Sequence, residues 1–207
     1  SKGHAAVCMY IAMAIRGFFD YDDIVRTYGK LGSAFGMHPC KVQLPGVEAS
    51  TGSLGHGLPI AVGMALHARQ AGLDHRVFVL MGDGETGEGS VWEGAIAGRS
   101  RELGNLVAFI DRNCQLMTSF SEDRIVLEPY ADKWRAFGWN VLEVDGHDMA
   151  SLVQAIDSLP GADSDRPTAV ICRTVKGHGV GFMERNLGWH AGSLGAADLQ
   201  RALDSLN

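Results

Sequence analysis

The sequence predicts one α/β domain over residues 1–207, with a doubly wound, mostly parallel sheet flanked by helices. From residue 77 onward, short apolar segments of strand length alternate with segments of helical length, which favours parallel strands joined by crossover helices. Two of these strands run into polar turns, and ligands of such sheets bind at the carboxyl ends of the strands. A chain of 207 residues can also bury one good core, so a single domain is expected.

The first part of the chain is predicted to be helical around one long irregular segment. Residues 5–15 form an apolar run long enough for a buried helix, and residues 22–28 suit a short second helix. Residues 32–55 contain Gly, Pro and Ser with little periodicity, which indicates a long ordered loop, usually functional in a compact domain. Residues 58–71 are small and apolar, as is typical of a buried helix with close neighbours.

The rest of the chain alternates between strand and helix patterns. Strands are predicted at residues 77–81, 106–110, 139–144 and 168–174. Helices are predicted at residues 90–101, 130–137, 149–158 and 196–206. A second glycine-rich loop is expected at residues 176–195.

Composition limits the class of partner. The formal net charge of −6 argues against nucleic acid or an anionic membrane surface, and no apolar run in the sequence is long enough to span a membrane. The four cysteines are scattered without a Cys-x-x-Cys pair, which favours reduced thiols in the cytoplasm over a zinc site or a disulfide framework. The 27 glycines cluster where backbone must turn tightly or approach a ligand.

A carboxylate and an amide follow two consecutive predicted strands. Gly82-Asp83-Gly84 ends the first of these strands, and Asp111-Arg112-Asn113 ends the second. Either half alone is common, since Asp-Gly favours turns and Asn often ends a strand. Together, in a strand–helix–strand context, they place oxygen ligands for Mg²⁺ beside glycines that let a bulky anion approach the backbone. The pair therefore predicts a site for a metal ion and a diphosphate.

This arrangement resembles the thiamine diphosphate (ThDP) signature, and nearly the whole chain resembles the transketolases. The resemblance implies that Mg²⁺ (or Ca²⁺) binds the side chains of Asp83 and Asn113 and the backbone carbonyl of Gln115. It also implies that the turn at Gly82 and Gly84 meets the diphosphate, with the Gly84 N–H as a donor. The fold implied is the diphosphate-binding domain of ThDP enzymes.

Histidines and a glycine-rich stretch extend the resemblance. SKGHAA at residues 1–6 looks like the family's SxGHA segment, which implies that His4 lies over the cofactor and the substrate. GMHP at residues 36–39 implies that His38 lies beside the donor ketose. TGSLGHG at residues 51–57 is similar to the family's TGPLGQG, with Ser53 in place of Pro and His56 in place of Gln. The residues implied to pass the aminopyrimidine ring are Gly52, Ser53 and Leu54.

Two further segments complete the implied site. Glu88 matches a Glu that links two cofactor sites across the dimer in transketolases, although a carboxylate at a helix N-terminus is also favoured by the helix dipole. Glu85 is expected to be solvated. The late loop, KGHGVGFME to WHAG, is similar to a family loop that closes over the diphosphate, and it implies that His190 lies near the substrate. Lys176 or His178 is expected to flank phosphate.

The stretches TGSLGHGLPIAVGMAL and NLGWHAG look most like the N-terminal subunit of split, two-chain transketolases. Such a subunit would need a pyrimidine-binding partner subunit, which supplies the Glu that activates the cofactor. The pair would transfer a two-carbon glycolaldehyde unit from a ketose, as a sugar or sugar phosphate, to an aldose. A two-fold symmetric heterotetramer is expected. The family segment that normally precedes SxGHA has no counterpart in the sequence, which leaves a trimmed chain and a short natural protein both open.

Other functions stay open at the level of sequence. One is a specialised ThDP-dependent acyl or ketol transferase of a secondary pathway. Another is an E1-like dehydrogenase subunit, which would need a lipoyl-domain partner and would not be expected to carry both the SKGHA and the MHP histidines. A third is a non-catalytic ThDP-fold protein, against which the intact His4, Asp83 and Asn113 argue.

Overall fold

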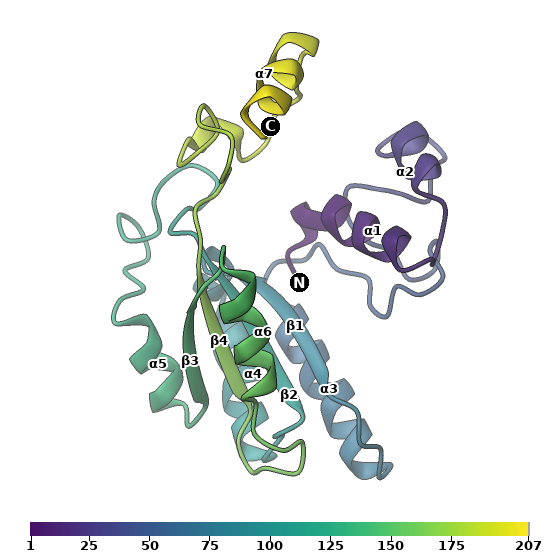
Figure 1. The fold of residues 1–207 in the computed structure, drawn as a ribbon. Coiled ribbons are helices and arrows are strands. Elements are labelled where there is room, and N and C mark those ends of the chain that lie inside the picture. The colour runs from purple at the N-terminus through teal and green to yellow at the C-terminus, as the bar shows by residue number, and fades with distance from the viewer. Residues whose placement is uncertain (207) are drawn as a thin grey trace.

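A parallel sheet forms the centre of the computed structural model, which describes residues 1–206 (Figure 1). Within these residues the sheet has four strands in the order β1-β2-β4-β3, and every neighbouring pair is parallel. The strands are β1 (Val77–Gly82), β2 (Leu106–Arg112), β3 (Asn140–Asp145) and β4 (Thr168–Arg173). The α/β fold class expected from the alternating pattern is therefore confirmed.

Helices cover the two faces of the sheet unequally. Side chains alternate along a strand, so Leu106, Ala108 and Ile110 of β2 pack into the larger core, while Val107 packs into a smaller one. The larger core lies beneath α3 (Gly57–Gln70), α4 (Gly89–Ser100) and α5 (Tyr130–Ala136). The opposite face is covered by α6 (Met149–Asp157), which lies in front of the sheet in Figure 1.

The N-terminal helices form a separate apolar cluster beside the carboxyl ends of the strands. Helices α1 (Ala6–Ile15) and α2 (Tyr21–Thr27) pack with the irregular segment at residues 32–55 through Tyr10, Phe35 and Leu44. The Tyr10 hydroxyl donates to the Gly36 carbonyl at 3.0 Å, which ties α1 to that segment. Figure 1 shows α1 and α2 apart from the sheet, with α7 (Ala196–Leu206) above it.

The expected elements differ from the structure mainly at their ends. Strand β2 continues to Arg112, so Asp111 and Arg112 pair with β4 instead of lying beyond the strand. Short 3₁₀ helices at Gly3–Ala5, Gly84–Gly87 and Leu187–Trp189 were not expected, because such turns have no apolar period. The last of them interrupts the segment predicted as a continuous loop at residues 176–195.

Among residues 1–206, no helix is long and apolar enough to cross a bilayer. All four cysteines are free, with Cys172 buried and Cys8 and Cys114 exposed.

Candidate active site

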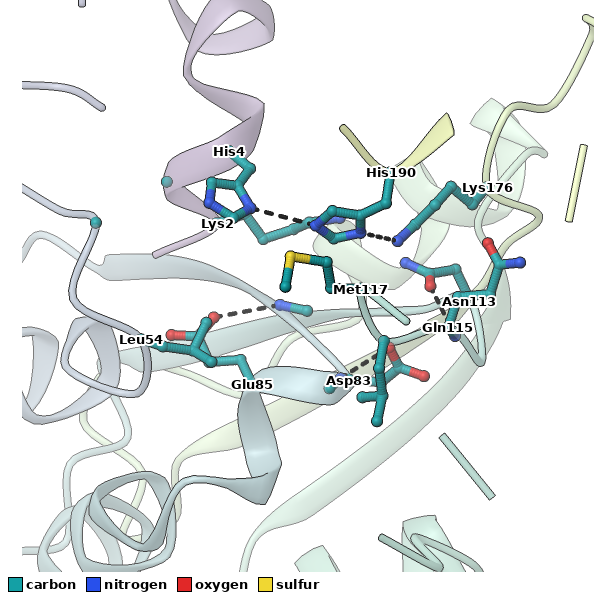
Figure 2. A pocket seen from close by; sticks show the side chains of 15 residues that line it. Lys2, His4, Leu54, Asp83, Glu85, Asn113, Gln115, Met117, Lys176 and His190 are labelled. Atoms are coloured by element: carbon teal, nitrogen blue, oxygen red, sulfur yellow. Dashed lines mark hydrogen bonds between the residues drawn. The ribbon is translucent and has the colours of Figure 1, made fainter. Parts of the chain in front are cut away.

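A cavity of about 350 Å³ lies at the carboxyl ends of β1 and β2 (Figure 2). Its lining comes from four parts of the chain that are distant in sequence: the N-terminal turn, the irregular segment at residues 32–55, the turns that follow β1 and β2, and the late loop. Nine of the residues expected at the site lie in this lining: His4, Gly52, Leu54, Gly82, Asp83, Gly84, Asn113, Gln115 and His190. In Figure 2, His4, His190 and Lys176 form a row above Asp83. The topology thus brings the two halves of the signature into one cavity.

Asp83 is buried at the end of β1, where it begins a 3₁₀ turn. Its Oδ1 accepts a hydrogen bond from the Gly84 N–H at 2.9 Å. Its Oδ2 accepts from the Cys114 N–H at 2.8 Å and from Arg112 Nη1 at 2.7 Å. Burial raises the pKa of Asp83 above its ordinary value, and Arg112 and the two N–H groups offset part of that rise. A bound cation would favour the charged carboxylate further.

Asn113 follows β2 and is oriented by its neighbours. Its Nδ2 donates to Asp111 Oδ2 at 3.0 Å, and its Oδ1 accepts from the Gln115 N–H at 3.0 Å. Asp111 in turn accepts hydrogen bonds from Lys2 and Thr174. Burial opposes ionisation of Asp111, but the Lys2 charge and these hydrogen bonds outweigh it and lower the pKa. Asp111 is therefore a carboxylate that fixes which atom of the Asn113 amide is the acceptor.

The backbone of Gln115 faces the same place. A Cβ at position 84 would lie 3.8 Å from the Gln115 carbonyl oxygen and 2.6 Å from Leu116 Cδ2. Glycine at position 84 therefore keeps the space between Asp83 and this carbonyl clear. The Gln115 side-chain amide is buried without a hydrogen-bond partner among residues 1–206, as is expected where a ligand group is still to be added.

These donors fit a hard cation such as Mg²⁺ or Ca²⁺. One carboxylate, one side-chain amide oxygen and one backbone carbonyl are all oxygen ligands, and Mg²⁺ takes its other ligands from water and phosphate. No group of three His, Cys, Asp or Glu that could hold a metal occurs in residues 1–206.

Three histidines gather at the mouth of the cavity. The ring centre of His4 lies 5.5 Å from that of His38 and 5.5 Å from that of His190. His4 Nδ1 and His190 Nε2 are 3.3 Å apart, and His190 Nδ1 is 3.0 Å from Lys176 Nζ. Burial, followed by the charge of Lys176, lowers the pKa of His190. A neutral imidazole beside a second imidazole can accept and return a proton near neutral pH.

Gly52 lies in the lining, whereas the expected residues Ser53 and Glu88 lie outside it. Gly52 has a φ of 139°, and a Cβ there would lie 3.0 Å from the His38 ring. Ser53 bonds His56 Nδ1 at 3.2 Å within the exposed turn before α3. Glu88 is exposed at the start of α4 and lies outside the lining.

His178, expected to flank phosphate together with or instead of Lys176, stacks on His147 at 3.8 Å and lies outside the lining. Lys176 lines the cavity. Of the two basic residues considered in the late loop, the structure therefore brings Lys176 to the site.

The expectation that Glu85 is solvated is wrong. Glu85 is 3% exposed, and its carboxylate accepts from the N–H groups of Gly55 at 3.0 Å and Gly82 at 3.4 Å. Nothing in the sequence marks this burial, because it depends on α3 and β1 converging. Other lining residues that the sequence did not single out are Lys2, Gly3, Leu116 and Met117. Lys2 and Gly3 lie inside the SKGHAA segment, whereas Leu116 and Met117 follow β2 in a stretch without a distinctive pattern.

A parallel sheet with oxygen donors and glycines at its strand ends is the architecture of a diphosphate-binding α/β domain. The family model "Transketolase, thiamine diphosphate binding domain" matches residues 1–206. The chain therefore belongs to the transketolase family. It is 40% identical over 203 residues to an apulose-4-phosphate transketolase subunit from Phocaeicola vulgatus, covering 98% of this chain and 71% of that protein.

A further relative and a solved structure are also transketolases. The chain is 36% identical over 190 residues to 6-deoxy-6-sulfo-D-fructose transketolase subunit SqwG of a Clostridium species, covering 92% of this chain and 68% of that protein. Among solved structures, transketolase from Campylobacter jejuni superposes with a TM-score of 0.91 at 28% identity over 100% of this chain. The chain spans 33% of that structure's length.

Proposed function

We propose that the chain is the diphosphate-binding subunit of a split, ThDP-dependent transketolase, which transfers a two-carbon glycolaldehyde unit from a ketose to an aldose. The observation that carries the proposal is the convergence of Asp83, Asn113 and the Gln115 backbone beneath a row of imidazoles. Family membership and the subunit names of the relatives support it.

ThDP would supply the carbanion that attacks the ketose carbonyl. The chain's own groups have distinct tasks around it. Asp83, Asn113 and the Gln115 carbonyl would hold Mg²⁺ or Ca²⁺, while Gly82 and Gly84 would leave room for the diphosphate.

His4 and His190 line the cavity above these ligands, where the sugar hydroxyls and carbonyl would lie, and the His38 ring centre is 5.5 Å from that of His4. The three imidazoles orient these groups and move their protons, and an imidazole N–H stabilises an oxyanion. Leu54 and Met117 add apolar surface to the cavity and exclude water from it.

A partner subunit completes the site in this proposal. Two relatives carry the names of transketolase subunits, one for apulose-4-phosphate and one for a sulfofructose. Both names describe ketoses with an anionic group, so we propose an anionic ketose as the donor class. A partner with a pyrimidine-binding domain would supply the activating Glu, and a two-fold symmetric hetero-oligomer would place ThDP between the two kinds of subunit.

The test is calorimetric binding of ThDP with Mg²⁺, first to this chain and then to its mixture with a candidate pyrimidine-domain subunit encoded beside it. Binding that requires Mg²⁺ and appears or tightens in the mixture is expected. Asp83→Ala should abolish it, whereas Asp204→Ala, on α7, should not. Unchanged ThDP affinity in the Asp83 variant would contradict the assignment.

A further inference from the structure

Arg112, the last residue of β2, is buried in direct contact with the proposed metal ligand. Its side chain is 6% exposed. Nη1 donates to Asp83 Oδ2 at 2.7 Å and to Ser121 Oγ at 2.8 Å, and Nη2 donates to Glu122 at 2.6 Å and Glu128 at 2.8 Å. The guanidinium therefore joins the end of β1 to the segment that follows β2.

The partners of Arg112 are themselves fixed. Glu122 accepts from the N–H groups of Leu127 at 3.3 Å and Glu128 at 3.2 Å. Glu128 Oε2 accepts from the Tyr130 N–H at 2.8 Å, and the Arg112 guanidinium lies 5.2 Å from the Tyr130 ring centre. With both nitrogens held from several directions, the guanidinium has little freedom to swing away from Asp83.

The two oxygens of Asp83 consequently have different surroundings. Oδ2 accepts two hydrogen bonds, one from Arg112 and one from the Cys114 N–H. Within residues 1–206, Oδ1 accepts only from the Gly84 N–H, and Gly84 lines the cavity. A cation at this site therefore finds one carboxylate oxygen free, since using both would require it to displace a charge-assisted hydrogen bond.

We propose that Arg112 is a positioning residue that limits Asp83 to one-oxygen coordination and thereby favours Mg²⁺ over Ca²⁺. The inference rests on the proposed function. Mg²⁺ needs compact octahedral geometry, in which a carboxylate supplies one oxygen, whereas Ca²⁺ takes six to eight ligands and readily accepts both oxygens of a carboxylate. A guanidinium bonded to Oδ2 acts against the second arrangement and leaves the first intact.

The test measures the dissociation constants of Mg²⁺ and Ca²⁺ by calorimetry, with ThDP present, in the complex with the partner subunit. The variants are Arg112→Met, Arg112→Lys and the control Arg135→Met, which removes an exposed arginine of α5. We expect Arg112→Met to weaken Mg²⁺ binding by about ten- to a hundredfold, as outer-shell substitutions do. Ca²⁺ binding should weaken much less, so the ratio of Ca²⁺ to Mg²⁺ affinity rises.

Arg112→Lys keeps the positive charge but lacks the two guanidinium nitrogens that bond Asp83 on one side and the two glutamates on the other. It should therefore fold and show a smaller rise in the ratio of Ca²⁺ to Mg²⁺ affinity. Circular dichroism checks the fold of each variant. Equal weakening of both metals, no change in a folded variant, or failure of Arg112→Lys to fold would overturn the proposal in favour of a purely structural role. If the wild-type complex binds no ThDP with either metal, the proposed function fails instead.

Discussion

The Asn113 amide donates through Nδ2 to Asp111 Oδ2 at 3.0 Å, which turns its carbonyl oxygen away from Asp111. Asp111 is held in turn by Lys2 from the N-terminal turn and by Thr174 from the end of β4. The orientation of Asn113, a proposed metal ligand just after β2, thus depends on the N-terminal turn and on the end of β4. Metal ligands commonly depend on such outer partners for their orientation.

Asp111→Asn should weaken Mg²⁺-dependent ThDP binding by about tenfold, because it removes the charge that attracts Lys2 and permits the Asn113 amide to flip. Calorimetry on the complex measures the change. Asp145→Asn, an equivalent substitution at the exposed end of β3, is the control and should bind as the wild type does. Equal affinities for all three proteins would show that Asp111 has no part in orienting Asn113.

Gly84→Ala should impair cofactor binding more than folding. The added methyl group would lie 2.6 Å from Leu116 Cδ2, the end of a flexible side chain, so Leu116 can move at modest cost to stability. The methyl group would nevertheless occupy space beside Asp83 that the diphosphate needs. ThDP affinity should fall strongly while the midpoint of thermal unfolding changes little.

Gly63→Ala in α3 provides the matched comparison for Gly84→Ala. Apart from its chain neighbours and the backbone of α3 itself, no atom of residues 1–206 lies within 4 Å of a Cβ at position 63. Alanine there should stabilise the isolated chain by about 0.5–1 kcal/mol, because glycine is a poor helix former. A Gly84 variant that loses stability in proportion to its ThDP affinity would show that the glycine is needed for the fold alone.

Much of this site follows from local pattern and topology. Two consecutive apolar strands ending in Gly82-Asp83-Gly84 and Asp111-Arg112-Asn113 must bring these residues together if they are parallel neighbours, and β1 and β2 are. The pattern could not show that β2 continues through Arg112, because a strand's end depends on its partner, here β4. Element types were therefore predicted better than their boundaries.

Polar contacts between residues distant in the chain could not be predicted from the sequence. Arg112 reads as an ordinary charged residue between two motif positions, yet it joins Asp83 to Glu122 and Glu128. Glu85 looks solvated because acidic residues near helix starts generally are, and only the approach of Gly55 shows where its carboxylate bonds. Such contacts depend on how distant segments pack against each other, and a single sequence does not show that packing.

The cysteines should differ sharply in reactivity. Burial raises the pKa of Cys172 to about 11, so its thiol stays protonated at pH 8, whereas Cys8 is exposed on α1. Iodoacetamide treatment of the folded chain, followed by peptide mass spectrometry, should label Cys8 and leave Cys172 unmodified until denaturant is added. Rapid labelling of Cys172 in the native chain would contradict the packing of β4 against α6.

His190 should titrate below its ordinary pKa, and Lys176 should contribute to the shift. Burial is the largest cause and the Lys176 charge the next, so Lys176→Met should raise the His190 pKa part of the way back toward 6.5. Because the His190 pKa is lowered in the folded wild-type chain, His190 binds a proton less readily there than in the unfolded chain. This contribution to stability is present above pH 6.5 and is lost as the pH falls through the lower, folded value.

NMR titration of the His190 ring protons gives the midpoint directly, with Lys30→Met as the control for loss of a distant, exposed charge. An upward shift in the Lys176 variant alone is the expected result. In the proposed mechanism, the lower pKa would favour the neutral form of His190, which would accept a proton from a sugar hydroxyl, and His4 lies 3.3 Å away. An identical midpoint with and without Lys176 would remove the lysine as a cause of the lower pKa, and burial alone would then have to keep the imidazole neutral.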